Sequence, residues 1–188
     1  MKEKSDLEKK VNELSSLDRI AFTIARDYYT SDTLSHAMTV TDTIDKMNPH
    51  YNKTVGIDFE ATDIDVFWKK ATIVAMLHDI IEDTNCTVDV LKEKNIPDDV
   101  INAILLVTRP KEKHDYFDDY IMKIAKNELS RVVKIADLEH NMDVRRLPKF
   151  SEYEQKRLMK YWYSWKYLKR EINEVSAHNA LHPDDKWR

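Results

Sequence analysis

The stretch DIDVFWKKATIVAMLHDIIEDT, residues 63–84, decides the fold. Its apolar residues recur at helical spacing as far as Leu77, which predicts a strongly apolar helix over 63–77 at the centre of the core. This helix runs directly into the segment HDIIED, residues 78–83, which holds four titratable side chains. Such groups are costly to bury unless they are paired or bind a cation. The stretch therefore predicts both the core of the protein and a polar site at one end of that core.

The rest of the chain also carries helical spacing, and it shows no convincing strand pattern. We expect further helices over 7–29, 33–47, 88–94, 97–107, 116–125, 128–146 and 151–177. Ser16 and Asp18 are available to cap a break within the first of these ranges, and Asn48-Pro49 predicts a stop for the second. The sequence therefore predicts an all-α fold, arranged as a helical bundle.

Length and composition predict a single domain. A chain of 188 residues fits one hydrophobic core, and its 42% hydrophobic and 34% charged residues argue against disorder. We therefore treat 1–188 as one domain, with a motif-bearing core over about 17–147 and a C-terminal packing helix over about 151–177. The polar connection over 50–62 holds the only glycine and is the segment that we expect to be mobile, and whether it acts as a lid stays open. One glycine also excludes a Gly-rich phosphate loop, so phosphate contacts must come from a metal, side chains or helix N-termini.

Charge and cysteine content favour a cytoplasmic protein. Cys86 is the only cysteine and can form no internal disulfide, and the charged N-terminal segment lacks the apolar region of a signal peptide. No stretch approaches the ~20 apolar residues needed to cross a bilayer. The net charge of −4 offers no global basic footprint for nucleic acid. A membrane role and a general nucleic-acid role are therefore not expected.

Four side chains have the types and the placement of a metal centre: His36, His78, Asp79 and Asp137. Each lies beside an apolar helical run. A lone histidine on such a run is more often a hydrogen-bonded core residue, and a lone aspartate is more often a cap, but the combination favours a metal. Imidazoles with carboxylates suit Mn²⁺, Fe²⁺, Co²⁺, Ni²⁺ or Zn²⁺ better than Ca²⁺. Because adjacent helical residues point about 100° apart, His78 and Asp79 can reach one ion only at a helix end or in a crease between helices.

Glu82 and Asp83 place two further carboxylates about one turn after the His-Asp pair. A metal at this position would lower the pKa of a bound water to near neutrality and make it a nucleophile. Glu82 is then the candidate general acid/base, and Asp83 is the candidate group that orients the water or the substrate. These residue types indicate metal-dependent hydrolysis.

The order of these groups resembles that of the HD-domain phosphohydrolases. The matching segments are His36, MLHDIIEDT at 76–84 and VKIADLEHNM at 133–142. Over about 22–147 the chain is most similar to the hydrolase domain of the RelA/SpoT-type alarmone enzymes, which use Mn²⁺ to remove the 3′-pyrophosphate of (p)ppGpp. The resemblance implies Mn²⁺ as cofactor, a small nucleotide as substrate, and a role for Asn141 in contacting the sugar or holding the site. The run over 26–37 departs from the purine-reading pattern of the family, so the metal chemistry carries over and the alarmone specificity does not follow.

Phosphate groups call for nearby cations. Arg145 and Arg146 follow Asp137 by about two turns and are candidate substrate contacts, of which one can face the site while the other is solvated. Lys134 lies one turn before Asp137 and is a candidate ion-pair partner for a site carboxylate. His140 is expected to pack or to bond the backbone.

Other functions stay open. The C-terminal helix interleaves Tyr and Trp with Lys and Arg over 160–170, which can stack the bases of single-stranded nucleic acid. Aromatic residues at this spacing more often pack against a core or a second subunit, so we expect packing and leave a homo-oligomer contact open. A (deoxy)nucleotide phosphohydrolase and a non-catalytic nucleotide sensor also stay open. The sensor predicts a missing acid, whereas Glu82 and Asp83 are both present.

Overall fold

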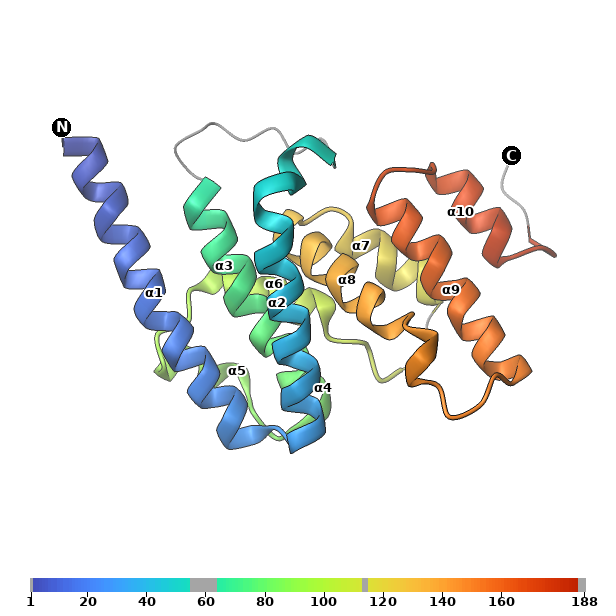
Figure 1. Ribbon diagram of the computed structural model, residues 1–188, viewed down its shortest axis with the longest axis horizontal. Helices are drawn as coiled ribbons and strands as arrows, with labels where there is room; N and C mark the ends of the chain where they lie inside the picture. Colours follow the sequence, from blue (N-terminus) through green and yellow to red (C-terminus); the bar gives the residue numbers. More distant parts are fainter. Residues whose placement is uncertain (1, 55–63, 113–114, 186–188) are drawn as a thin grey trace.

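The computed structural model describes residues 2–54, 64–112 and 115–185, and every regular element within these ranges is a helix. The all-α prediction is therefore confirmed. The elements are α1 (Lys2–Tyr28), α2 (Ser31–Thr54), α3 (Ile64–Leu77), α4 (Ile80–Asp83), α5 (Val88–Glu93), α6 (Asp98–Val107), the π-helical segment η1 (Tyr116–Ile121), α7 (Met122–Ile124), α8 (Glu128–Asn141), the 3₁₀ turn η2 (Val144–Arg146), α9 (Glu152–Leu168) and α10 (Glu174–Leu181). Figure 1 shows α1 at one end of an elongated molecule and α9 with α10 at the other.

Helix α3 is the centre of the core, as its sequence predicts. It packs against α1, α2, α6 and α8. A helix that is enclosed on several sides needs apolar residues around most of its circumference rather than along one stripe. Its buried side chains are Val66, Trp68, Ala71, Ile73, Val74, Ala75 and Leu77.

The central helix stops where its polar residues begin. After Leu77 the chain turns through His78-Asp79, and α4 starts at Ile80. Asp79 has φ −98° and ψ 3°, and its carbonyl oxygen accepts a 2.9 Å hydrogen bond from the amide of Asp83. His78 and Asp79 therefore lie at a helix end, which is one of the two placements that let neighbouring residues reach a single ion.

Two expected interruptions in the N-terminal half are wrong. α1 continues through Ser16 and Asp18, because the Ser16 hydroxyl donates to the carbonyl of Glu13 inside the helix (2.6 Å) and Asp18 accepts from Lys69 (3.3 Å). α2 continues past Pro49 to its end at Thr54. A proline removes one rung of the helical hydrogen-bond ladder, and here the helix resumes beyond it. Most of the connection over 50–62, which is expected to be mobile, lies outside the described residues.

Two helices in the C-terminal half are shorter than predicted. α8 ends at Asn141 rather than near 146, and the Asp143 carboxylate then accepts from the amide of Arg145 (3.1 Å) to start a 3₁₀ turn. The single helix expected over 151–177 is two helices, α9 and α10. Between them Arg170 has φ 60°, a left-handed conformation that an α-helix cannot contain, so the chain changes direction there.

Helix α9 packs on α8, as expected for an aromatic C-terminal helix. The Trp165 indole nitrogen donates to Glu139 at 3.0 Å. Arg131, of which only 1% is exposed, donates to the carbonyl of Leu168 at 2.7 Å and forms an ion pair with Glu128. These contacts attach the C-terminal helices to the core. Among the described helices, none is both long and apolar enough to span a bilayer.

Replacing Asn127 by Ala is expected to lower the free energy of unfolding by about 1 kcal/mol, because this residue caps α8. Its side-chain oxygen accepts from the amide and the hydroxyl of Ser130, at 2.9 and 3.0 Å. Denaturant unfolding of the variant measures the loss. Asn173→Ala removes the same kind of cap from the outer helix α10 and is the matched control. A free energy of unfolding that is unchanged in Asn127→Ala while it falls in Asn173→Ala would contradict the capping role of Asn127.

Candidate metal centre

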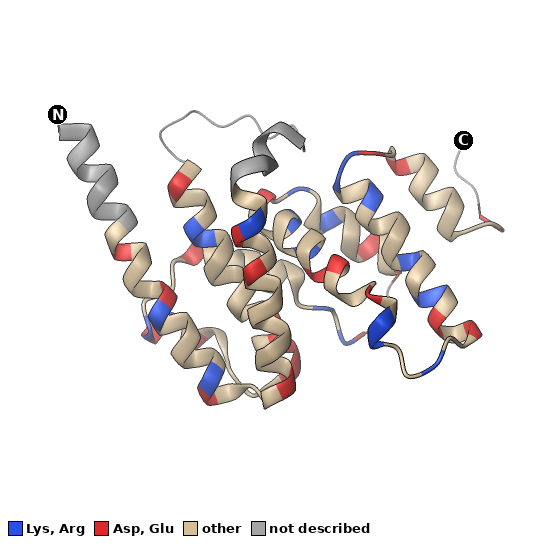
Figure 2. Cartoon of the chain, in the orientation of Figure 1, with Lys and Arg blue, Asp and Glu red and all other residues tan. Residues whose placement is uncertain are grey.

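Three separate helical segments bring the four predicted metal ligands together. His36 lies in the second turn of α2, His78-Asp79 lies between α3 and α4, and Asp137 lies on α8. α3 and α8 both pack against α2. Figure 2 shows acidic positions gathered around α4 and the adjoining start of α2. The tertiary fold therefore joins side chains that lie far apart in the sequence.

The donor atoms of these side chains have the separations of a ligand shell. His36 Nε2 lies 3.1 Å from His78 Nε2, 3.5 Å from Asp79 Oδ2 and 3.2 Å from Asp137 Oδ1. His78 Nε2 lies 3.0 Å from Asp79 Oδ2 and 3.8 Å from Asp137 Oδ1. Bonds of about 2.1 Å to one ion place neighbouring ligand atoms about 3.0–3.4 Å apart. His36, His78 and Asp79 each place one donor atom within 4.8 Å of the other two, and Asp137 Oδ1 lies near both histidines, so the four side chains are candidate ligands of one divalent cation.

Neighbouring groups fix the orientation of His78 and Asp137. The Nδ1 of His78 lies 2.8 Å from the carbonyl oxygen of Ala75, which can only accept, so Nδ1 donates and Nε2 is left as a ligand. Lys134 donates to Asp137 Oδ2 at 2.7 Å, and Asn141 donates to Oδ1 at 2.5 Å. The ion-pair role expected for Lys134 is present. Partners of this kind hold metal ligands in place in other proteins.

His140 packs against His36, as expected, with the two rings stacked and their centroids 4.7 Å apart. Its Nδ1 lies 2.5 Å from His36 Nδ1 and 3.2 Å from Arg146 Nη1. Burial lowers the pKa of His140, which favours the neutral form that can accept a hydrogen bond. His36 Nδ1 then donates to His140, and His36 Nε2 keeps its lone pair for a metal. Periodicity along α8 could not reveal this contact, because the partner residue is on α2.

The electrostatic balance of the site favours a cation. Burial alone lowers the pKa of His78, but the Asp79 and Asp137 carboxylates and the Ala75 carbonyl together outweigh burial and raise that pKa to about 9. Burial alone raises the pKa of Asp137, yet Lys134 and the two histidines hold it well below its usual range. The imidazoles therefore sit in a strongly negative field. A proton on His78 neutralises part of this negative charge, and a divalent cation would neutralise more of it.

A cleft of about 260 Å³ opens beside the ligands. It is lined by His36, Asp79, Glu82, Asp83, Arg109, Tyr116, Tyr120, Lys134, Asp137, Asn141, Arg146 and Tyr161. The carboxylate of Glu82 accepts from the amide of Arg109 at 2.8 Å, which fixes one of its oxygens. Burial raises the pKa of Glu82, and burial with the Asp79 charge raises that of Asp83. A carboxyl group with a raised pKa is suited to exchange protons near neutrality.

The two candidate phosphate contacts have different positions. Arg146 lines the cleft, whereas Arg145 does not and has 86% of its side chain exposed. Arg145 pairs with Asp143 at 2.8 Å. The two arginines follow each other in η2, and only one of two adjacent side chains can turn inward there.

Sequence reasoning missed the aromatic wall of the cleft. Tyr116 and Tyr161 line it, the first from η1 and the second from α9. Arg109 Cζ lies 5.7 Å from the centroid of the Tyr116 ring, and Lys160 Nζ lies 4.4 Å from the same centroid. The sequence pattern of the C-terminal helix predicts packing for Tyr161. Its position beside the candidate ligands depends on how α9 packs against α8, which that pattern does not show.

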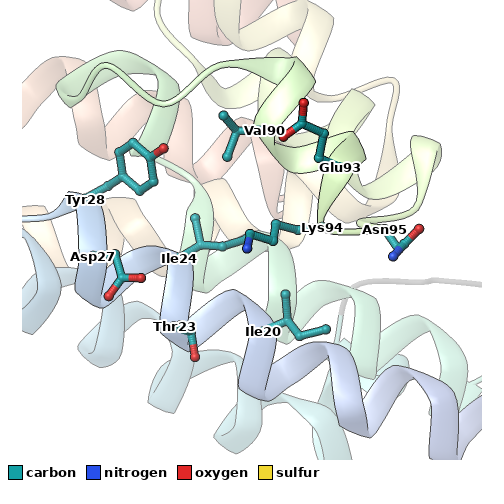
Figure 3. Close-up of a pocket in the computed structure, with 9 residues that line it drawn as sticks. All are labelled: Ile20, Thr23, Ile24, Asp27, Tyr28, Val90, Glu93, Lys94 and Asn95. Carbon is teal, nitrogen blue, oxygen red and sulfur yellow. The ribbon is translucent and has the colours of Figure 1, made fainter.

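A larger hollow lies elsewhere, between α1 and α5, with a volume of about 690 Å³. Figure 3 shows side chains of α1 facing those of α5 and of the turn that follows it. Its lining combines apolar residues with Asp27, Glu93 and Lys94, and among the residues that the structure describes there it holds no histidine. The donor set of a transition-metal site is therefore found in the smaller cleft.

Comparison of the sequence with family models and with curated proteins finds no match.

Replacing His140 by Phe is expected to weaken Mn²⁺ binding about 10- to 100-fold, because His36 loses the acceptor that orients it. Isothermal titration with Mn²⁺ measures the change. His140→Asn restores a side-chain acceptor and should recover most of the affinity. Equal affinities of the Phe variant and the wild type would show that His140 only packs.

Proposed function

We propose that this chain is a metal-dependent phosphohydrolase of the HD type that acts on a small nucleotide. The observation that carries the proposal is the convergence of two imidazole nitrogens and two carboxylate oxygens, with separations of 3.0–3.8 Å in the pairs that involve a histidine. Mn²⁺ is the cation that we propose for it, and other first-row divalent ions fit the same donors.

The residues around the ligands support hydrolysis rather than metal storage. A divalent cation held there supplies Lewis acidity and lowers the pKa of a bound water. The oxygen of the attacking water bonds to phosphorus, and Glu82 takes the proton of that water. At the same time the bond between phosphorus and the leaving oxygen breaks. Glu82 then passes the proton to the leaving oxygen. Asp83 lines the same cleft and orients the water or the substrate.

Cations and aromatic rings in the cleft support an anionic nucleotide as substrate. Arg109, Lys134 and Arg146 line it together with Asn141. Arg side chains form paired hydrogen bonds to phosphate oxygens. The tyrosine rings offer flat apolar faces to a base or a sugar.

The positive charge extends beyond the cleft, which supports a substrate with phosphates at two positions. Lys160 Nζ lies 4.4 Å from the centroid of the Tyr116 ring, which also lines the cleft, and Arg109 lies over the same ring. A pyrophosphate at the metal and a second one near Lys160 match the charge distribution of (p)ppGpp. We therefore rank an alarmone-type pyrophosphohydrolase first and a (deoxy)nucleotide phosphohydrolase second.

The proposal is tested by phosphate and pyrophosphate release from ppGpp, dNTPs, NMPs and cyclic nucleotides. Purified protein is assayed with Mn²⁺, with chelator, and with Mn²⁺ restored after the chelator. We expect pyrophosphate from ppGpp, loss of turnover in chelator, and recovery with Mn²⁺. Preference for a dNTP would favour the second function. Nucleotide binding without turnover of any compound would contradict a hydrolase and favour a sensor.

A further inference from the structure

A second cluster of imidazoles and carboxylates lies where α10 meets η1. His178 on α10 and His182 at its C-terminal end face Asp118 and Asp115 of the η1 segment. His178 Nδ1 lies 3.0 Å from Asp118 Oδ1, and His182 Nε2 lies 2.7 Å from Asp115 Oδ2. The two rings stack with centroids 4.3 Å apart. The cluster thus unites two ring nitrogens and two carboxylates.

Hydrogen bonds to the backbone fix which ring nitrogens face the carboxylates. His178 Nε2 lies 2.7 Å from the carbonyl oxygen of Asp185, and His182 Nδ1 lies 3.1 Å from the carbonyl oxygen of His178. A carbonyl oxygen only accepts, so these two nitrogens carry protons. In the neutral imidazoles the other nitrogens therefore present lone pairs to Asp118 and Asp115.

Two lone pairs facing two carboxylates need positive charge between them. A divalent cation held between the ring nitrogens and the carboxylate oxygens would supply that charge. His78 at the first candidate centre is arranged in the same way. Its Nδ1–H donates to the carbonyl of Ala75, and its Nε2 faces Asp79. Metal-binding histidines characteristically donate their remaining N–H in this way.

We propose that Asp118, His178 and His182 form a second divalent-cation site, with Asp115 as a further ligand or hydrogen-bond partner. One donor atom from each of the three lies within 4.8 Å of the other two. His178 is buried, with 2% of its side chain exposed, whereas Asp118 and Asp115 are 32% and 37% exposed and can turn to admit an ion. Imidazole and carboxylate donors select Zn²⁺ or a neighbouring first-row ion.

The second site is separate from the first. Figure 1 shows α10 at the end of the molecule that is far from the lower part of α1 and from α4. Asp115 and Asp118 flank Tyr116, which lines the catalytic cleft. A cation held between η1 and α10 would therefore hold the segment that carries one wall of that cleft. Binding of a cation at this second site does not require that the proposed hydrolysis takes place.

The test counts Zn²⁺ ions bound to the full chain without a histidine tag. The His36→Gln/Asp79→Ala variant removes the first centre, and equilibrium dialysis should then show one bound Zn²⁺. Adding either His182→Gln or Asp118→Asn should weaken this binding at least tenfold. Asp184→Asn changes an exposed neighbouring acid and should leave it unaltered.

Circular dichroism checks that each variant keeps its helices. The histidine ¹⁵N NMR spectrum of the first-centre variant provides a measurement that needs no further substitution. Zn²⁺ should shift the ring nitrogens of His178 and His182 that face the carboxylates. Absence of Zn²⁺ binding in the first-centre variant, or unchanged binding and spectra at these two histidines, would overturn the second site.

Discussion

Asp79→Ala is expected to reduce metal-dependent hydrolysis at least about 10³-fold while leaving the fold intact. Asp79 supplies a donor atom 3.0 Å from His78 Nε2 and 3.5 Å from His36 Nε2. A catalytic cation contributes several kcal/mol of transition-state stabilisation, and about 4 kcal/mol corresponds to a factor of 10³ in rate. The measurement is kcat/KM for the preferred nucleotide, with Mn²⁺ affinity determined in parallel.

Glu82→Gln separates the chemistry from metal binding. Glu82 lines the cleft and accepts from the Arg109 amide, and it is not one of the four metal ligands. Its variant should bind Mn²⁺ about as well as the wild type and should lose about 10²- to 10⁴-fold in kcat. Asp42→Ala, an exposed acid on α2, should leave activity unchanged. Full activity in Asp79→Ala would contradict the metal centre, and full activity in Glu82→Gln would contradict only the assigned base.

Arg131→Ala is expected to lower the free energy of unfolding by about 3–5 kcal/mol. Its guanidinium is 1% exposed, forms an ion pair with Glu128, and donates to the carbonyl of Leu168 at the end of α9. Replacing Arg131 by Ala leaves a cavity. It also leaves the Leu168 carbonyl, at the C-terminus of α9, without its charged hydrogen-bond donor. Urea unfolding measures the change.

Arg170→Ala is a matched control, because Arg170 pairs with the same glutamate. It donates to Glu128 Oε1 at 2.8 Å, but 52% of its side chain is exposed. Solvent screens an exposed pair, so its loss should cost less than about 1 kcal/mol. Comparable losses for the two arginines would show that burial of Arg131 does not contribute to its effect.

The sequence predicts the parts of the fold that depend on local pattern. The apolar run over 63–77 identifies the central helix, because enclosure by several helices requires apolar residues on most of its sides. Helix ends are predicted less well. Ser16 resembles a cap in sequence, yet its hydroxyl bonds back to Glu13 within the helix. The end of α9 depends on the left-handed Arg170, a residue type that gives no signal for that conformation.

The convergence of the four candidate ligands could be predicted from the sequence, and the wall around them could not. His36, His78-Asp79 and Asp137 each lie beside an apolar helical run, so burial brings them together. His140 and Tyr161 join the site only through the crossing of α8 with α2 and of α9 with α8. Such contacts depend on docking geometry, which the spacing of residues within one helix does not encode.

The origin of the ligands in three separate segments couples metal supply to the thermodynamics of folding. An unfolded chain holds residues 36, 78, 79 and 137 far apart, so the proposed cation would bind the native state almost exclusively. At a free concentration 100 times its Kd, such a ligand adds about 2.7 kcal/mol to native stability. Removal of the metal by a chelator would then raise the population of unfolded chains, which proteases can cleave. Under the proposed function, metal availability therefore sets the lifetime of the protein as well as its turnover.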